Sequence, residues 1–384
     1  MTATVAIVGG GPVGLYLALA LLHEGIEPRV FERADASRAR GSRSIGIHPP
    51  SIELFDELGL GASFLARATR VRRGIAFGES GSIGDVSFDR CPGPHRFVAT
   101  LEQWKTEAWL RAALLERAPN ALVSPAHVGE VRREHGSVTI FFTSPQGTLG
   151  TASFAAAVGA DGKRSVVRRA IGASFDGATY DGEYAMADGP DTTSFGDDAA
   201  VFLTRDGLVE SFPLPGRRRR WVVRRDERGG APSVEEIVEI VLARAHQPLD
   251  PATLEAPSAF RAEHRLASRL ALGRIALVGD AAHIVSPIGG QGMNLGWIGA
   301  RSVARVLGRE LSCGRDPSAA LERDATRRAI EARTATRRAE MNMWLGRPTR
   351  RSATRANLVR SLLALPTSHL LARAFTMRAL GLGL

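Results

Sequence analysis

The N-terminal hydrophobic pattern predicts a strand, a helix and a second strand in close succession. Residues 5–8 (VAIV) form a short apolar run, and a longer apolar run, 13–22, follows a glycine-rich turn. The first run predicts a buried strand, and the second predicts a helix that stops near Gly25. Residues 28–31 (PRVF) predict the next strand, which ends in the acid Glu32. Together they indicate a βαβ unit of an open α/β sheet.

Two later segments also combine an apolar strand with glycine and aspartate. Residues 158–172 (VGADGKRSVVRRAIG) reach Asp161 at the end of their strand, and residues 273–296 (GRIALVGDAAHIVSPIGGQGMNLG) reach Asp280. Open α/β sheets bind ligands at the carboxyl ends of their strands. We therefore expect Asp161 and Asp280 to lie at positions where the sheet presents a ligand.

The middle and the C-terminal parts of the chain have different patterns. Residues 73–98 and 176–262, approximately, alternate apolar and polar positions and are rich in Gly, Asp and Thr, which predicts antiparallel strands. From about residue 316 onward the pattern predicts helices, the last of which are basic and apolar. Turns between the antiparallel strands are expected at two dipeptides, Asp206-Gly207 and Pro215-Gly216.

Composition favours a cytoplasmic globular protein. The 384 residues have a hydrophobic content of 44% and only two cysteines, Cys91 and Cys313, which excludes a disulfide scaffold and suits a reducing compartment. The apolar run 13–22 has about half of the ~20 residues that a bilayer requires, so we predict neither a membrane span nor a signal peptide. We also predict no metal site.

A formal net charge of +10 raises the question of a nucleic-acid partner. Almost all of the positive charge is arginine, with Lys105 and Lys163 as the only lysines, and no basic motif is interleaved with aromatic residues. Composition bias explains this charge better, so we expect no nucleic-acid partner. The basic, apolar C-terminal helices leave contact with a membrane surface open, although packing against the rest of the protein is the plainer interpretation.

The first glycine-rich turn has the spacing of a dinucleotide-binding fingerprint, Gly9-x-Gly11-x-x-Gly14. Gly9 would form the tight turn, Gly11 would let the backbone approach a pyrophosphate, and Gly14 would let the helix pack closely on the strand. The helix N-terminus would add unpaired N–H groups and a positive dipole end. Glu32 is placed to accept hydrogen bonds from a ribose. The fingerprint alone leaves NAD and FAD open.

The three signatures follow one another in the order fingerprint, Asp161-Gly162 and Gly279-Asp280. In this order the chain resembles, over about residues 4–310, the group A flavoprotein monooxygenases, the family of para-hydroxybenzoate hydroxylase. The resemblance implies an α/β fold: a Rossmann-like FAD-binding domain, an inserted, mainly antiparallel β-sheet substrate domain, and C-terminal helices. It implies an FAD-binding domain at 1–72, 97–175 and 263–315, a substrate-binding domain at 73–96 and 176–262, and a C-terminal helical region at 316–384.

The resemblance also implies how a bound FAD lies along the chain. Arg43 would reach the pyrophosphate, Gln103 the ribityl region, Val128 the adenine through its backbone, and Asp280 the ribityl hydroxyls. Arg43 could instead be a surface arginine, and Gln103 an ordinary first residue of a helix. The residues implied to contact FAD are Gly9, Gly11, Pro12, Val13, Gly14, Glu32, Arg33, Arg43, Gln103, Val128, Asp161, Asp280, Gly290, Gly292, Met293 and Asn294.

In this family NADPH or NADH reduces the flavin, O₂ adds at flavin C4a, and the hydroperoxide delivers one oxygen atom. The resemblance therefore implies an NAD(P)H-using monooxygenase that hydroxylates or epoxidises an aromatic or polyene-type small molecule, for example one of secondary metabolism. Pro287 would lie at the reactive edge of the ring, and the helix that starts near Met293 would direct its positive end at the flavin. No side-chain acid or base is assigned, and His283 is better explained as structural than as catalytic.

The substrate pocket and the reaction leave alternatives open. Phe202, Phe212, Leu214 and Trp221 are candidates for the pocket wall, although each also suits an ordinary sheet core. With only three tyrosines in the chain, we do not expect the tyrosine relay that deprotonates a phenol in para-hydroxybenzoate hydroxylase. Either the substrate is already electron-rich, or another base serves.

Two other flavoenzyme classes compete with the monooxygenase interpretation. An FAD-dependent reductase or dehydrogenase of the same fold, without oxygen transfer, is the main alternative. A flavin-dependent halogenase would need a catalytic lysine and a Trp-x-Trp-x-Ile-Pro motif; neither Lys105 nor Lys163 suits that role, and the motif is absent.

Overall fold

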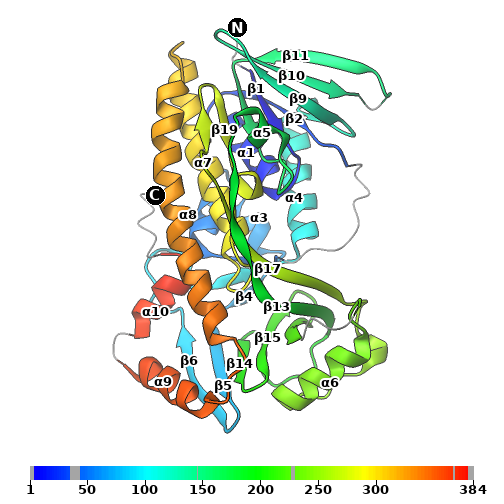
Figure 1. Cartoon of the computed structure of the whole chain (residues 1–384), viewed down its shortest axis with the longest axis vertical. Coiled ribbons are helices and arrows are strands. Elements are labelled where there is room, and N and C mark those ends of the chain that lie inside the picture. Colours follow the sequence, from blue (N-terminus) through cyan, green and yellow to red (C-terminus); the bar gives the residue numbers. More distant parts are fainter. Residues whose placement is uncertain (1–3, 35–43, 145, 226–229, 366–367, 379–384) are drawn as a thin grey trace.

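The structure is a computed structural model, and it describes residues 4–34, 44–144, 146–225, 230–365 and 368–378. Figure 1 shows an elongated molecule with a mainly parallel sheet towards one end and a large antiparallel sheet towards the other. Two long strands and one long helix run between these ends. This arrangement confirms the predicted fold class, an α/β domain combined with an antiparallel sheet and C-terminal helices.

The parallel sheet contains the N-terminal βαβ unit that the hydrophobic pattern predicts. Strand β1 lies in the middle, parallel to β2 on one side and to β12 on the other. Its apolar residues are buried because both faces of the sheet are covered. In sheet order the strands are β18 (Ala271–Leu272), β19 (Ile275–Leu277), β12 (Ala156–Gly159), β1 (Thr4–Val8), β2 (Glu27–Phe31) and β8 (Leu122–Val123).

Four helices build the core around this sheet. Helix α1 is apolar nearly throughout because it packs against both α4 and α7, and eight of its residues are buried. Helix α7 in turn packs against α8. These helices are α1 (Pro12–His23), α4 (Gln103–Arg117), α7 (Gln291–Ser312) and α8 (Ser318–Leu345).

Two smaller sheets and several short helices complete the fold. A three-stranded antiparallel sheet packs β10 between β9 and β11, and a second small sheet places β7 between β3 and β4. The short helix α5 contacts β9. The strands are β9 (His127–Arg133), β10 (Val138–Thr143), β11 (Leu149–Phe154), β3 (Gly46–Ile47), β7 (Val98–Thr100) and β4 (Thr69–Val71); the helices are α2 (Pro49–Glu57), α3 (Gly61–Leu65), α5 (Val166–Ala170) and the 3₁₀ turn η2 (Gly279–Ala281).

The second large sheet has eight strands. Strands β14, β15 and β16 form an antiparallel meander whose turns fall at the two predicted dipeptides. Both turns contain a glycine with positive φ, Gly207 and Gly216. In sheet order the strands are β20 (His283–Ile284), β17 (Ser258–Ala267), β13 (Phe175–Pro190), β16 (Arg218–Arg225), β15 (Gly207–Leu214), β14 (Ala199–Thr204), β5 (Arg73–Gly78) and β6 (Gly81–Ser87).

The two faces of this sheet are covered by different elements. Helix α6 (Val234–Ala245), followed by the 3₁₀ turn η1 (Pro251–Thr253), covers one face. The other face packs against Ile288, which precedes α7, and against Met343 near the end of α8. Because side chains alternate along a strand, neighbouring residues of β15 and β16 belong to different cores.

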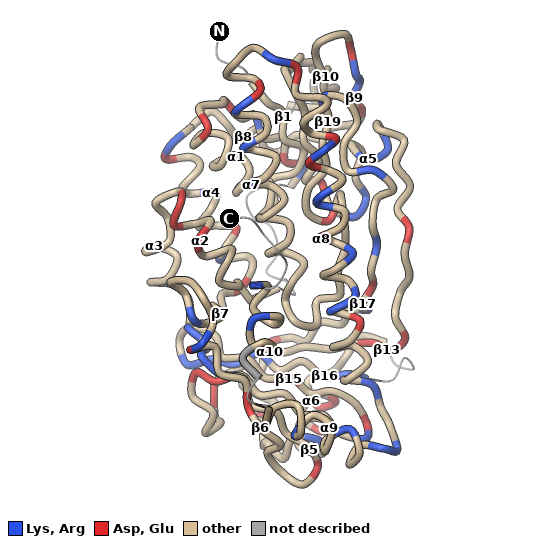
Figure 2. Tube along the Cα trace, turned by 90° about the vertical axis from the view of Figure 1, so that its left-hand side faces the viewer, with Lys and Arg blue, Asp and Glu red and all other residues tan. Residues whose placement is uncertain are grey.

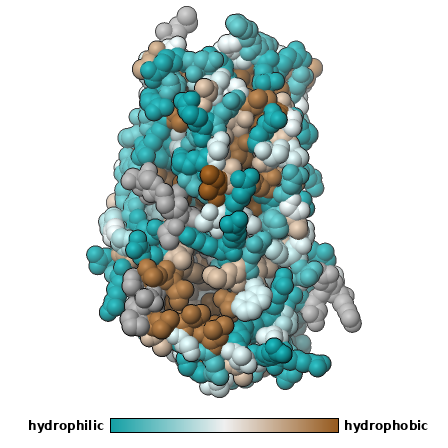
Figure 3. Space-filling view, turned by 60° about the vertical axis from the view of Figure 1, so that its left-hand side comes forward, coloured by the Kyte–Doolittle hydropathy of each residue, from teal (hydrophilic) through white to brown (hydrophobic). Residues whose placement is uncertain are grey.

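The predicted C-terminal helices are present. Helix α8 has 28 residues and extends towards the eight-stranded sheet, where α9 (Ser352–Ala364) and α10 (Ser368–Phe375) contact β6. Figure 3 shows apolar side chains around a hollow at this end of the molecule. The exposed apolar residues of α9 and α10 are Leu358, Leu362, Leu370 and Phe375. Within the described part of the chain, no helix is both long and apolar enough to cross a membrane.

Charged residues are mixed rather than segregated. Figure 2 shows Lys and Arg interleaved with Asp and Glu along the trace. Many of the arginines are paired with acids; Arg301, for example, binds both Glu24 and Glu57. Part of the arginine content is therefore engaged in the protein's own ion pairs.

Candidate functional site

A cleft of about 670 Å³ lies at the carboxyl ends of β1, β2 and β12 and continues along the loop before α7. It brings together residues that are as much as 285 positions apart in the sequence, Val8 and Met293. Gly14 and Asn294 are outside the lining, and Arg43 falls outside the described residues. The predicted cofactor residues and the flavin-loop proline that line the cleft are Gly9, Gly11, Pro12, Val13, Glu32, Arg33, Gln103, Val128, Asp161, Asp280, Pro287, Gly290, Gly292 and Met293.

The conformation of the first glycine-rich segment requires glycine at two positions. Gly9 has φ of +106°, and a Cβ there would collide with the carbonyl oxygen of Ala160. A Cβ on Gly14 would collide with the carbonyl oxygen of Gly9. A Cβ on Gly11, in contrast, would meet nothing within 4 Å, so the missing side chain leaves open space beside the N-terminus of α1.

Glu32 lies at the end of β2 with its carboxylate already engaged by the backbone. Oε2 accepts a hydrogen bond from Gly10 N at 2.6 Å, and Oε1 accepts one from Ala34 N at 2.8 Å. Each carboxylate oxygen has a further lone pair, so these bonds orient Glu32 without exhausting it. Glu32 therefore holds the glycine loop in shape as well as lining the cleft.

Asp161 combines a structural bond with an unused oxygen. Its Oδ2 accepts a hydrogen bond from Val166 N at 2.7 Å, at the start of α5. Its Oδ1 is buried and has no hydrogen-bond partner among the described residues. Burial raises the pKa of this carboxyl group, although hydrogen bonds from Ser165 and Val166 oppose the shift. An orphan acceptor in the cleft wall is suited to a ligand hydroxyl or amide.

Arg168 is a residue of the second motif that sequence reasoning missed. Its Nη1 donates to the carbonyl of Ala281 at 3.0 Å, and its Nη2 donates to the carbonyl of Lys163 at 2.7 Å. The guanidinium also lies 3.8 Å from the ring centre of Phe175. Arg168 thus ties the Asp161 loop to the Asp280 turn, and an arginine within an arginine-rich helix gave no signal of this role.

Asn294, in the first turn of α7, stabilises the loop before this helix by hydrogen bonds. Its Nδ2 donates to Gly290 O at 2.7 Å and to Gly46 O at 2.9 Å. His48 adds a contact of 3.1 Å between its Nε2 and Gly289 O, and burial lowers the pKa of His48 to about 4. Asn294 is therefore a support of the loop, while Pro287 and Gly290 face the cleft.

The mouth of the cleft is basic. Lys163, Arg164, Arg169 and Arg261 line it together with Glu263. Lys163 Nζ forms an ion pair with Glu263 Oε1 at 2.6 Å, and all four basic residues are exposed. Such a rim attracts anionic ligands.

Two other predicted cofactor residues lie on β9 and at the start of α4. Val128 is on β9, paired with Phe142. Gln103 is the first residue of α4, and its Nε2 donates to Glu107 Oε1 at 2.7 Å. Both residues line the cleft.

Comparison with known proteins identifies the family of this chain. The family described as FAD binding domain matches residues 2–339. The chain belongs to this FAD-binding family of flavoprotein monooxygenases. FAD, which the sequence predicted, is therefore the cofactor of the domain.

Three relatives illustrate the family. This flavoprotein is 31% identical over 304 residues to pentachlorophenol 4-monooxygenase of Sphingobium chlorophenolicum, a match that covers 77% of this chain and 56% of the relative. It is 31% identical over 342 residues to anhydrotetracycline monooxygenase of Streptomyces rimosus, a match that covers 85% of this chain and 67% of that relative. The solved anhydrotetracycline hydroxylase OxyS of Streptomyces rimosus superposes with a TM-score of 0.80 at 27% identity, covering 98% of this chain and 76% of that one. The flavoprotein thus spans about half to two thirds of the length of these two curated relatives.

The cleft of this flavoprotein fits FAD on two structural observations. The open space at Gly11 gives a phosphate access to the backbone at the N-terminus of α1, where N–H groups lack partners within the helix. The orphan Oδ1 of Asp161 supplies an acceptor farther along the cleft. Within the described residues, no group of three or more His, Cys, Asp or Glu side chains is arranged to hold a metal ion.

The four candidate substrate residues divide between the two faces of the eight-stranded sheet. Phe202 and Trp221 pack with Ile237 of α6, on the face that turns away from the flavin loop. Phe212 packs in the cluster that contains Ile288, on the opposite face. Leu214 shares the face of Phe212 by strand alternation and is buried. Sequence reasoning could not separate the faces, because both carry large apolar residues.

Proposed function

We propose that this protein is an FAD-dependent, NAD(P)H-using monooxygenase that inserts one oxygen atom from O₂ into an aromatic or polyene-type small molecule. The observation that carries the proposal is the single cleft that joins the fingerprint loop to the loop at Pro287, which in turn packs under the eight-stranded sheet. Bound FAD would supply the redox chemistry, transferring two electrons from NADPH or NADH and activating O₂.

In this proposal each part of the chain has a physical task. The α1 N-terminus and Gly11 would bind the pyrophosphate, and Glu32 would bind the adenosine ribose. Asp161 and Asp280 would accept hydrogen bonds from the polyol part of the cofactor. The loop at Pro287 and Gly290 would bring backbone groups and the positive end of α7 to the ring, which stabilises negative charge there.

The eight-stranded sheet and the C-terminal helices would enclose the substrate. The sheet face that meets Ile288 offers Phe212, Met186 and Tyr184, a largely apolar surface. The exposed apolar residues of α9 and α10 lie beside β6 of the same sheet, and they support an apolar substrate that enters from this side. Apolar walls also exclude water from the reaction.

The test is a product analysis on the purified protein. We expect bound flavin in its visible spectrum, NADPH or NADH oxidation stimulated by a phenolic substrate, and a product heavier by one oxygen atom. With ¹⁸O₂ that atom should carry the label. Oxidation of NAD(P)H that yields only hydrogen peroxide with every substrate would instead identify a reductase, and a preparation without flavin would contradict the proposal altogether.

A further inference from the structure

The sheet face that meets the flavin loop carries one carboxylate without a partner. Glu210 lies in the middle of β15, is only 7% exposed, and is directly paired with Val201 of β14 and Val222 of β16. None of the described residues donates a hydrogen bond to it or forms an ion pair with it, and desolvation is the only effect on its pKa, which burial raises to about 7. A buried carboxylate without a donor is costly, so such a group calls for a functional explanation.

Glu210 points into the layer between the sheet and the loop. By strand alternation it shares a face with Leu208 and Phe212, its neighbours two residues away on β15. Both pack in the cluster that includes Ile288, the residue that follows Pro287 of the cleft. The carboxylate is therefore on the side of the sheet where a substrate over the loop would lie.

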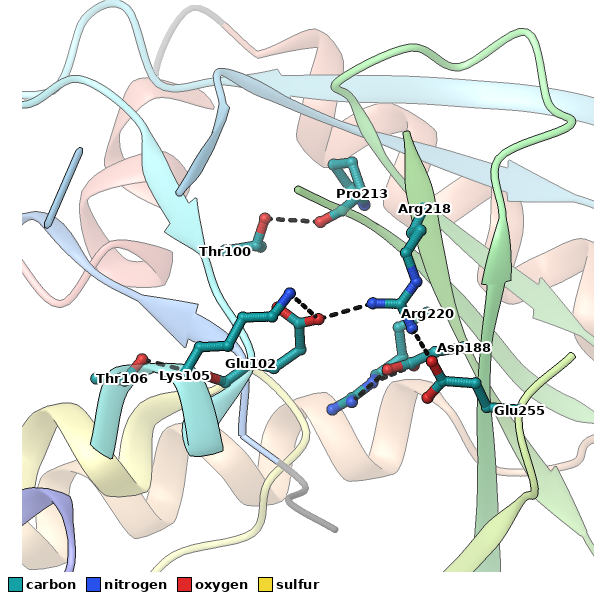
Figure 4. A network of polar contacts seen from close by, with 9 residues as sticks. All are labelled: Thr100, Glu102, Lys105, Thr106, Asp188, Pro213, Arg218, Arg220 and Glu255. Atoms are coloured by element: carbon teal, nitrogen blue, oxygen red, sulfur yellow. Dashed lines mark hydrogen bonds and ion pairs between the residues drawn. The ribbon is translucent and has the colours of Figure 1, made fainter. Parts of the chain in front are cut away.

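Two other charged residues on this sheet face, Arg218 and Arg220, are paired with acids, whereas Arg224, two residues beyond Val222 on β16, has two buried guanidinium nitrogens without a hydrogen-bond partner among the described residues. Arg220 Nε and Nη2 donate to Asp188 at 2.7 and 2.8 Å, and Arg218 bridges Glu102 at 2.8 Å and Glu255 (Figure 4). Glu102, at the N-cap of α4, and Glu255 lie outside the sheet, so the pairs of Arg218 join the sheet to neighbouring segments. They leave Glu210 as an acid that the described chain itself does not satisfy.

The pKa of Tyr184 responds to the charge of Glu210 and also to Arg224 of β16 and to Arg347, which follows α8. Burial, followed by the charge of Glu210, raises the pKa of Tyr184 to about 12, while Arg224 and Arg347 oppose the shift. Tyr184 therefore stays protonated, and it can donate a hydrogen bond but does not act as a base at neutral pH. The loop residues Pro287 and Ile288 bring no titratable group to this layer.

We propose that Glu210 is the general base that accepts the proton of a phenolic hydroxyl group in the substrate. This proposal rests on the proposed monooxygenase function. The O–H bond of the phenol breaks, the proton moves to a carboxylate oxygen of Glu210, and the electron pair stays on the phenolic oxygen. The resulting phenolate is richer in electrons at the carbons ortho and para to that oxygen, where an electrophilic oxygen atom adds.

The same arrangement selects the substrate class. A neutral phenol satisfies the Glu210 carboxylate by donating a hydrogen bond to it, whereas an aromatic carboxylate would place two negative charges in one apolar layer. Methyl ethers of the same phenols have no proton to give. Glu210 therefore favours neutral phenols over both benzoates and aryl ethers.

The experiment compares wild type with Glu210→Gln, Glu210→Asp and a control, Glu239→Gln, whose side chain is exposed on α6. For a phenol that the wild type hydroxylates, we expect kcat/KM to rise with pH up to about 7. Glu210→Gln should lose about 10²- to 10⁴-fold in hydroxylation at pH 7 and lose this pH dependence. Glu210→Asp should keep the pH dependence at lower activity, and Glu239→Gln should match the wild type.

The outcomes separate the two proposals. If the wild type oxygenates no phenol, the proposed function fails before the variants are compared. If the wild type hydroxylates phenols and Glu210→Gln keeps both its rate and its pH profile, the base assignment is overturned while the function stands. Bound flavin in each variant, read from the visible spectrum, shows that the fold is intact, and Glu210→Asp supplies the test should Glu210→Gln fail to fold.

Discussion

Asn294 and His48 are joined by a hydrogen bond between residues 246 positions apart: the backbone N–H of His48 donates to Asn294 Oδ1 at 2.8 Å. The same side chain donates from Nδ2 to the carbonyls of Gly46 and Gly290. One fully buried amide thus satisfies three backbone groups and links β3 to the loop before α7. The shape of the loop that faces the cleft depends on this link.

Replacing Asn294 should loosen the loop and weaken cofactor binding. Asn294→Ala removes three hydrogen bonds and leaves buried backbone groups unpaired, so we expect a loss of about 2–4 kcal/mol in the free energy of unfolding. Asn294→Asp keeps an acceptor for His48 but turns an oxygen towards two carbonyls, so it should also lose FAD affinity. Urea unfolding and FAD titration measure both effects. Asn357→Ala, an exposed site on α9, is the control, and an Asn294→Ala variant as stable as this control would contradict the prediction.

The glycines of the first loop should respond differently to alanine. Gly9→Ala introduces a collision with Ala160 and strains a φ of +106°, so we expect it to lower stability by several kcal/mol. Gly11→Ala meets no protein atom within 4 Å, so the apoprotein should fold normally. The new methyl group would occupy the space beside the α1 N-terminus, and we expect FAD affinity to fall at least tenfold.

Thermal unfolding of the apoproteins and FAD titration separate these two effects. Gly74→Ala, at a β5 position with no atom within 4 Å, controls for the general cost of adding a methyl group. Equal FAD affinity in Gly11→Ala and wild type would show that the cofactor does not approach this loop.

Local features of this fold could be predicted from sequence, and the family resemblance predicted that three distant motifs share one cleft, but other contacts between distant segments could not be predicted. The βαβ unit and the turns at Gly207 and Gly216 follow from short-range patterns in which each residue type has one physical reason. The sequence could not assign residues to the two faces of the eight-stranded sheet. Phe212 and Trp221 are both large apolar residues, and only the position of α6 separates them. The support that His48 gives the loop depends on a contact across 241 positions, which no local pattern encodes.

Arg164, one of the exposed arginines at the cleft mouth, offers a test of how the reductant approaches. If NADPH or NADH enters over this rim, Arg164→Gln should raise its KM about 3- to 10-fold with kcat nearly unchanged, because one exposed charge contributes to binding on the order of 1 kcal/mol. The effect should shrink at high salt. Steady-state kinetics at two ionic strengths, with Arg323→Gln on α8 as a distant control, provide the measurement. An unchanged KM at low salt would exclude approach over Arg164.

Glu210 and two buried histidines should act on stability with opposite dependences on pH. Burial raises the pKa of Glu210 from 4.5 to about 7, so between these values the folded protein binds more protons at this site than the unfolded chain does. Stability from this group is therefore fully present below about pH 4.5 and falls as the pH rises to about 7. Burial lowers the pKa of His48 and of His283 from 6.5 to about 4, so their contribution rises over about pH 4 to 6.5.

Removing the Glu210 charge should therefore stabilise the protein only where the carboxylate is ionised. A difference of about 2.5 pKa units corresponds to roughly 3 kcal/mol, so Glu210→Gln should exceed wild type by about that amount at pH 8. At pH 4.5 the two proteins should be nearly equal, because Gln resembles protonated Glu. Urea unfolding of both proteins at each pH gives the difference directly, and the histidine contributions cancel because both proteins share them. A stability gain of the same size at both pH values would mean that the carboxylate is not held in its costly ionised form, and it would remove the energetic reason for regarding Glu210 as poised to accept a proton.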